Sequence, residues 1–321
     1  MAHSMNSNLK QLLTTDRPFL TDGGLETTLV FHEGLDLPAF AAFPLLNDTK
    51  GRETLRNYFD NFLQLAQQND TGFVLDTPTW RASQGWADET GFSSEAIDRI
   101  NARAVSFARD IAAAWGEKGV PVVVNGVVGP QGDGYVPGQT MTAEEAQEYH
   151  ARQVVSFATA GADMVSAVTM NYVEEAIGIA RAAKVAGVPV VISFTVETDG
   201  KLPTGQGVGD AIALVDAATD ASPIYYMINC AHPDHYSAIL GGADWTARLG
   251  GMRANASRMS HEELDNAEEL DDGDPVEFGE LHAAMMRGLT GIKVLGGCCG
   301  TDHRHVGEVG KCCVKGHAHA A

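Results

Sequence analysis

Five cysteines are the residues of this 321-residue chain best suited to metal or redox chemistry. Four of them form the adjacent pairs Cys298–Cys299 and Cys312–Cys313, and Cys230 stands alone. Neighbouring cysteines seldom bridge each other, and a cytosolic chain keeps its thiols reduced. Metal ligation or catalysis is therefore favoured over a disulfide framework.

Three of these cysteines follow apolar runs that are typical of buried strands. Cys230 follows residues 224–229, and Cys298 and Cys299 come shortly after residues 292–295. Three thiolates brought together bind Zn²⁺ at about 2.3 Å and leave a fourth tetrahedral position open, as a catalytic zinc requires. A thiol bound there loses its proton near neutral pH and can attack an electrophilic carbon. Cys230, Cys298 and Cys299 are therefore the predicted metal ligands and catalytic residues.

The cysteines can meet only in a fold that brings their strands together. Strand-like runs alternate with amphipathic stretches; the runs are 19–22, 72–76, 120–124, 163–168, 188–194, 224–229, 245–249 and 292–295. The helical stretches are 52–69, 95–116, 142–160, 173–186, 208–219, 233–240, 278–289 and 302–311. This alternation predicts an α/β fold, a single-domain (β/α)8 TIM barrel, with an open doubly wound sheet as the alternative.

The boundaries follow from the same pattern. We expect a polar extension over residues 1–16, the barrel over 17–310 and a tail over 311–321, with a charged, solvated excursion at 261–275. Thr142 and Glu145 are spaced as a capping box, and Ser94 is the predicted cap of the second helix.

Composition excludes several classes of function. The net charge of −20, from 42 acidic and 22 basic residues, repels phosphate backbones and argues against nucleic-acid binding. No apolar run approaches the ~18 residues of a membrane helix, and the polar amino terminus does not read as a signal peptide. A cytoplasmic location without membrane contact is expected, and the sequence permits a homo-oligomer.

The carboxyl ends of the predicted strands, where barrel enzymes carry their chemistry, hold a recognisable set of motifs. Asp22-Gly23-Gly24 with Thr27 and Leu29, Asn229-Cys230, and Gly296 to Thr301 resemble the homocysteine S-methyltransferase family over roughly residues 17–310. The resemblance implies a barrel, a zinc ion held by the three cysteines, and methyl transfer to homocysteine to give methionine. The barrel takes up nearly all of the chain and leaves no room for folate or cobalamin modules. The resemblance therefore also implies a small sulfonium donor, S-methylmethionine or S-adenosylmethionine.

The resemblance also assigns substrate contacts. Gly23 and Gly24 match the turn whose amides meet the substrate carboxylate, with Asp22 and Asn229 beside the site. The family usually has a glutamate at the end of strand 4, where this chain reads Ala167-Val168-Thr169-Met170. We hypothesise that Glu26 or Glu197 supplies the missing carboxylate.

Other interpretations stay open at this point. At the end of the second predicted strand, Asp76 or Arg81 can shape the pocket. Trp80, in the same segment, either packs against the protein or faces a sulfonium donor. One rival function is a zinc barrel enzyme of another class, a lyase or hydrolase acting on a different thiol or carbonyl substrate. Another is a non-catalytic zinc- or thiol-binding protein, which needs a fourth ligand from His232, His235 or the tail, whose metal-capable residues are Cys312, Cys313, His317 and His319.

Overall fold

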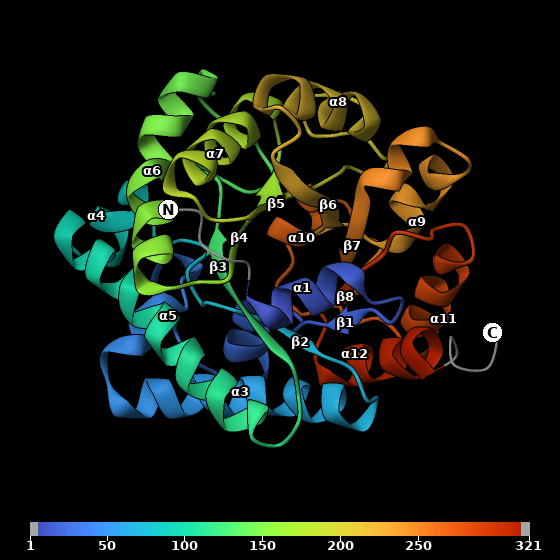
Figure 1. The fold of residues 1–321 in the computed structure, drawn as a ribbon, viewed down its shortest axis with the longest axis horizontal. Helices are drawn as coiled ribbons and strands as arrows, with labels where there is room; N and C mark the ends of the chain where they lie inside the picture. Colours follow the sequence, from blue (N-terminus) through green and yellow to red (C-terminus); the bar gives the residue numbers. More distant parts are fainter. Residues whose placement is uncertain (1–5, 316–321) are drawn as a thin grey trace.

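Eight parallel strands close into one barrel in the computed structural model, which describes residues 6–315 (Figure 1). The strands follow chain order: β1 (Phe19–Leu20), β2 (Phe73–Asp76), β3 (Val122–Val128), β4 (Met164–Met170), β5 (Val190–Phe194), β6 (Pro223–Asn229), β7 (Leu249–Ala254) and β8 (Val294–Gly297). The ring closes at β1, where Leu20 is aligned with Phe73 of β2 and with Leu295 of β8. The predicted single-domain (β/α)8 barrel is confirmed, and the open sheet is wrong because every strand has two neighbours.

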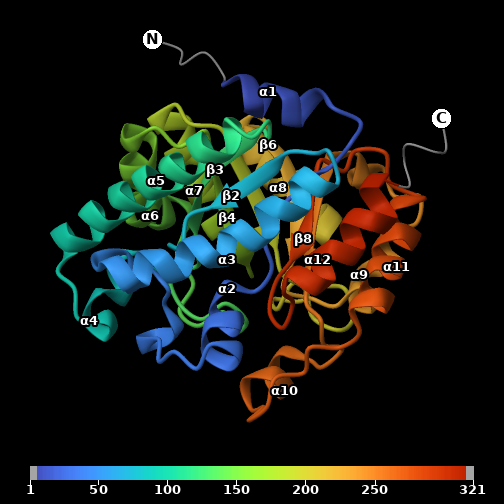
Figure 2. The same cartoon turned by 90° about the horizontal axis from the view of Figure 1, so that it is seen from below.

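Helices surround the barrel and connect successive strands (Figure 1, Figure 2). The longer ones are α3 (Thr49–Gln68), α5 (Ser94–Gly116), α6 (Ala143–Ala160), α7 (Val173–Ala186), α8 (Val208–Thr219) and α11 (Pro275–Met286). The shorter ones are α1 (Ser7–Thr14), α2 (Leu25–Thr27), α4 (Ala87–Thr90), α9 (Pro233–Tyr236), α10 (His261–Asp265) and α12 (His303–Val309). Brief 3₁₀ or π turns are η1 (Thr28–His32), η2 (Pro38–Phe40), η3 (Phe43–Asn47), η4 (Gln84–Trp86), η5 (Ser237–Leu240), η6 (Asp244–Arg248) and η7 (Gly310–Lys315). No helix within residues 6–315 is both long and apolar enough to cross a membrane.

Local signals explain where the outer helices begin. The Thr142 hydroxyl accepts from the Glu145 amide at 3.2 Å, and the Glu145 carboxylate accepts from the Thr142 amide at 2.8 Å, which confirms the capping box of α6. Helix α5 is capped by Ser93, whose hydroxyl accepts from the Ala96 amide at 3.3 Å. The prediction of Ser94 is wrong by one position, because a cap needs the extended backbone that Ser93 has and Ser94 is already helical.

Helix α1 covers the amino-terminal end of the barrel, opposite the end where α10 protrudes (Figure 2). Its Leu9 and Leu12 are fully buried and join the cluster of side chains inside the barrel, which includes Phe19, Val74 and Val123. This helix lies within the polar extension expected over residues 1–16, and its apolar face shields the barrel core from water.

Strand β7 differs from its predicted position. The run at 245–249 is mostly a 3₁₀ turn, and the strand begins where the run ends. A Cβ at Gly250 would lie 2.6 Å from the Tyr225 side chain, and one at Gly251 would lie 2.7 Å from the Met227 sulfur. The large side chains of β6 therefore require glycines on β7, and glycines weaken the strand signal that periodicity detects.

Candidate active site at the carboxyl end of the barrel

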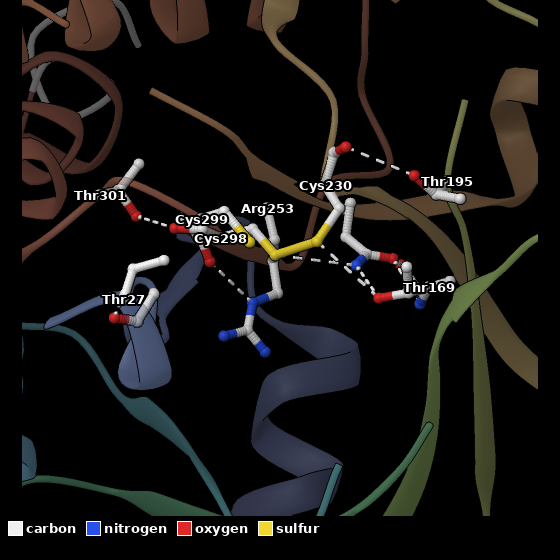
Figure 3. Close-up of a disulfide and its surroundings, with 12 residues drawn as sticks. Thr27, Thr169, Thr195, Cys230, Arg253, Cys298, Cys299 and Thr301 are labelled. Atoms are coloured by element: carbon white, nitrogen blue, oxygen red, sulfur yellow. Dashed lines mark hydrogen bonds between the residues drawn. A yellow bond between two sulfur atoms is a disulfide. The ribbon is translucent and has the colours of Figure 1, made fainter. Parts of the chain in front are cut away.

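The three predicted metal ligands meet at one rim of the barrel (Figure 3). Cys230 directly follows β6, and Cys298 and Cys299 directly follow β8. Their sulfur atoms all lie within 4.8 Å of one another. Strand β7 separates the two strands, so the closed parallel sheet is what brings the thiols together.

Unusual backbone geometry directs these side chains. Cys230 has a φ of 54°, in the left-handed region that few residues other than glycine adopt, and its amide donates to the Arg253 carbonyl at 3.1 Å. Gly300, with a φ of 76°, turns the chain directly after Cys299. The Thr301 hydroxyl then donates to the Cys298 carbonyl at 2.7 Å and secures the turn.

Cys230 and Cys298 are joined by a disulfide, with Cα atoms 5.4 Å apart, and Cys299 keeps a free thiol (Figure 3). This bond was not among the predictions, which favoured reduced thiols. Disulfide and metal exclude each other, because zinc binds thiolates. The donor set still fits zinc, since it consists of three sulfurs close enough to share one ion. The reduced site therefore offers three ligands, and the oxidised site offers one.

Each sulfur has one hydrogen-bonding neighbour from the surrounding strands and loops. The pairs are Tyr135 Oη with Cys299 Sγ at 3.4 Å, Asn229 Nδ2 with Cys298 Sγ at 3.9 Å, and Thr169 Oγ1 with Cys230 Sγ at 3.8 Å. Donors of this kind stabilise thiolate charge and orient metal ligands. Tyr135 and Thr169 were not predicted as site residues.

Asn229 links neighbouring strands at the rim through its side-chain hydrogen bonds. Its amide oxygen accepts from the Thr169 amide at 2.9 Å and from the Ser193 hydroxyl at 2.6 Å, and its Nδ2 donates to the Thr169 hydroxyl at 2.9 Å. These bonds fix Thr169 in a left-handed conformation, with a φ of 62°. Asn229 lines the pocket as well, but its polar groups are already engaged.

His261 and Tyr135 form a wall beside the sulfurs. Their rings stack with centroids 3.9 Å apart, and His261 Nε2 lies 2.7 Å from the Cys230 carbonyl oxygen. His261 Nδ1 lies 3.0 Å from the carboxylate of Glu197. Glu197 thus faces His261 and is absent from the pocket lining, whereas Glu26 lines the pocket. The charged excursion that begins at His261 is therefore not simply solvated, because its first residue is buried beside Cys230, one of the predicted metal ligands.

A pocket of about 430 Å³ opens in front of the cysteines. Asp22, Gly23, Gly24 and Glu26 all line it. The Gly24 amide donates to the Thr301 carbonyl at 2.9 Å, so it is not free to meet a carboxylate. The Gly23 amide donates to no backbone carbonyl among residues 6–315. Burial raises the pKa of the Glu26 carboxyl to about 7, and the Asp22 charge adds to the rise.

A buried ion cluster forms the floor of this pocket. Arg253 Nη2 lies 2.5 Å from Asp22 Oδ1, and Nη1 pairs with the carboxylate of Asp76. Its Nε donates to the Gly297 carbonyl at 3.2 Å. Burial raises the pKa of Asp22 to about 7 against the opposing effect of the Arg253 guanidinium.

The remaining lining is strongly acidic. The carboxylates that line the pocket are Asp22, Glu26, Asp76, Asp133, Asp265, Glu269 and Asp271, and the only cationic side chains among the described lining residues are Arg81 and Arg253. Four of these acids, from Asp133 onward, lie on the loop after β3 and on the 261–275 excursion. This surplus of negative charge favours a cationic ligand.

The other metal-capable residues lie away from the cysteine cluster. His232 Nδ1 accepts from the Asp234 amide at 3.2 Å, and His235 Nε2 lies 3.0 Å from the carbonyl of Arg258. Within residues 6–315 the metal-capable cluster comprises the three cysteines alone.

Two further cysteines, Cys312 and Cys313, belong to η7 and pack against the outer core; burial raises the pKa of the Cys313 thiol to about 12. His317 and His319 lie outside the described residues.

Comparison with known proteins identifies a family by sequence and a set of similar folds by structure. A sequence model of the homocysteine S-methyltransferase family matches residues 19–313. Among solved structures, the chain is similar to the homocysteine methyltransferase MmuM from Escherichia coli in its oxidised and metallated forms, each with 20% identity, a TM-score of 0.74, and coverage of 95% of this chain and 99% of that one. The apo form of MmuM gives 18% identity, a TM-score of 0.67, and coverage of 94% and 98%. At these identities the structural likeness supports the barrel fold.

Proposed function

Because the chain belongs to the homocysteine S-methyltransferase family, and is therefore a methyltransferase, we propose that it methylates the thiol of homocysteine to give methionine. The methyl donor in this proposal is a small sulfonium, S-methylmethionine or S-adenosylmethionine. The cofactor is Zn²⁺, held by Cys230, Cys298 and Cys299.

The convergence of three sulfurs within 4.8 Å, on residues that line one pocket, is the observation that carries the proposal. When bound, zinc supplies a Lewis acid that lowers the pKa of a coordinated thiol. The acceptor sulfur then forms a bond to the methyl carbon as the bond from that carbon to the sulfonium breaks. The electron pair of the broken bond stays on the departing sulfur, and the thiol proton leaves to solvent.

The chain's own side chains support both substrates. Tyr135, Thr169 and Asn229 donate toward the ligand sulfurs and hold them in place. The acidic lining attracts a sulfonium, whose positive charge is lost as the methyl group departs. Of the two glutamates considered, we favour Glu26 for the substrate ammonium, because it lines the pocket and Glu197 pairs with His261.

The cellular setting is part of the same proposal. A reducing compartment such as the cytoplasm keeps the three thiols available for zinc. The product would then contribute to methionine biosynthesis. We also propose that the catalytic barrel spans residues 17–310, with 1–16 and 311–321 as appendages, and that a homo-oligomer is compatible with this function.

The test measures methionine formation and zinc content together. Wild type and Cys298→Ser are assayed with homocysteine and each donor, and Cys312→Ser serves as the matched control because its thiol lies outside the cluster. We expect zinc and activity in wild type and in the control, and loss of both in Cys298→Ser. Full zinc occupancy without methyl transfer to any thiol would contradict the proposal and favour the lyase, hydrolase or binding alternatives.

A further inference from the structure

Two arginines line the pocket, and their charges are met differently. The Arg253 guanidinium is paired with Asp22 and Asp76. Arg81, which follows β2, has no ion pair or hydrogen bond among residues 6–315, and its Nε is buried without a partner. The charge of Arg253 is therefore neutralised within the protein, whereas the N–H groups of Arg81 are available to a ligand.

Aromatic rings hold Arg81 in place. Its guanidinium carbon lies 3.9 Å from the ring centroid of Trp86 and 4.8 Å from that of Trp80. Trp80 is itself confined, because a Cβ at Gly129 would come within 2.7 Å of its ring. Trp80 therefore packs against the loop after β3 and against Arg81. A guanidinium stacked on aromatic rings loses little further freedom when it binds a planar anion.

The nearby acids do not satisfy this cation. Asp133 accepts from the amides of Tyr135 and Val136 at 2.8 and 2.9 Å, so its Oδ1 stabilises the loop. Asp133, Glu26 and Glu89 each act to raise the pKa of Arg81 by electrostatic attraction, but none forms an ion pair with it among residues 6–315. Burial lowers the pKa of Arg81, and such a desolvated cation gains from a bound anion.

The order of groups around the rim matches one ligand class. Cys298 and Cys299 follow β8, Glu26 follows β1 and Arg81 follows β2, and these strands are consecutive in the closed barrel. A ligand spanning them meets sulfur, then a carboxylate, then a guanidinium. Since the Gly24 amide is already bonded to Thr301, the glycine turn has lost one of its two donors for a substrate carboxylate.

We propose that Arg81, clamped between Trp80 and Trp86, binds the α-carboxylate of the methyl acceptor and selects for amino-acid thiols. This inference rests on the proposed function, which supplies the thiol acceptor. A carboxylate and a guanidinium can form two parallel charge-assisted hydrogen bonds, which fix the acceptor's orientation with its thiol toward the cysteines. Arg81 is thereby a specificity residue for the acceptor.

The experiment compares homocysteine with 3-aminopropane-1-thiol, which has the same thiol and amine but no carboxylate. In Arg81→Gln we expect kcat/KM for homocysteine to fall about 10- to 100-fold, with little change for the decarboxylated thiol. Arg81→Lys should retain part of the preference. Arg56→Gln is the matched control, because Arg56 also stacks on a ring, that of Phe107, but does not line the pocket.

Two results would overturn the inference. One is an equal loss for both thiols, which would mean that Arg81 only supports the fold. The other is a changed preference between S-methylmethionine and its amide with the acceptor unaffected, which would assign Arg81 to the donor.

Product binding separates this inference from the proposed function. Titration of methionine and of methioninamide, followed by tryptophan fluorescence, needs no turnover. We expect wild type to prefer methionine and Arg81→Gln to lose that preference, even if no thiol is methylated. Equal binding of the two ligands by wild type would overturn the assignment of Arg81, whatever the assays of methyl transfer give.

Discussion

Asp22 and Arg253 form a buried ion pair across the floor of the pocket, with Oδ1 and Nη2 2.5 Å apart. Asp22 lies two residues after β1 and Arg253 lies on β7, and the second carboxylate, Asp76, ends β2. One guanidinium therefore ties together three strand ends beneath the pocket. Such a pair is costly to break, because removing one partner leaves the other charge buried and unpaired.

Replacing Arg253 with methionine should destabilise the protein strongly. The two remaining carboxylates are largely buried, and the free energy of unfolding should fall by about 3–5 kcal/mol at neutral pH. Burial already raises the pKa of Asp22 to about 7, above the unfolded value of 3.8, so the folded state holds the proton more tightly. Stability of the variant should therefore fall as pH rises from about 5 to 8. Urea unfolding at several pH values measures this.

The control for that variant is Arg258→Met. Arg258 pairs with Asp234 and Glu277 on the surface, with half of its side chain exposed, and should contribute about 0–1 kcal/mol. Similar losses for the two variants would show that burial of the Arg253 cluster carries no special cost.

Glu26 should give the acceptor's KM a characteristic pH dependence. Its pKa is raised to about 7, so the side chain is mostly neutral at pH 6 and mostly charged at pH 8. If the carboxylate binds the substrate ammonium, KM for homocysteine falls across that range in wild type. In Glu26→Gln, KM for homocysteine at pH 8 should be about tenfold higher than in wild type, and the ammonium should contribute no pH dependence to it.

A substrate without the amine isolates this effect. Dividing KM for homocysteine by KM for 4-mercaptobutanoate, which lacks the amine, removes the contribution of thiol ionisation. Glu33→Gln is the control variant, because Glu33 is exposed and lies outside the pocket. A ratio that is independent of pH in wild type would assign the ammonium to another group.

The barrel and the cysteine cluster were predictable because their signals are local. Each strand run predicts its own end, and parallel strands put their carboxyl ends at one rim, so Cys230 and Cys298 had to approach each other. Among the strands, the shift of β7 was missed, because Gly250 and Gly251 weaken the pattern.

The surroundings of the sulfurs were not predictable in the same way. Arg253 meets partners 177 and 231 residues away in the chain, and no periodicity links them. Tyr135 lies in the irregular loop after β3, and His261 begins the short helix α10. The placement of both rings depends on tertiary contacts such as the ring stack itself. Arg253 was not predicted as a site residue, and its position near the end of a strand is the one signal in the sequence that points to the site.

Gly24→Ala should disturb the proposed zinc site through packing alone. Gly24 has a φ of −78°, which alanine adopts easily, but an added Cβ would lie 2.6 Å from the Cys298 carbonyl oxygen. We expect a loss of about 1–3 kcal/mol in the free energy of unfolding, together with weaker zinc binding. Gly138→Ala, in open space on the loop after β3, should be nearly neutral. Normal zinc affinity in Gly24→Ala would show that the turn and the cysteine loop move independently.

Tyr135→Phe removes one hydroxyl and keeps the stack on His261, so it isolates the hydrogen bond to Cys299, which spans 3.4 Å. Outer partners of metal ligands typically change affinity or activity by about 10- to 100-fold, and we expect the zinc dissociation constant to rise by about tenfold. Competition with a chromogenic chelator under reducing conditions measures this dissociation constant.

Tyr226→Phe is the matched control, because the Tyr226 hydroxyl bonds to Asp216 on the outside of the barrel. If both variants bind zinc as wild type does, the tyrosine shapes the pocket wall without stabilising the thiolate. A selective loss in Tyr135→Phe instead ties the loop after β3 to the metal, and explains why a residue remote in sequence from every cysteine belongs to the site.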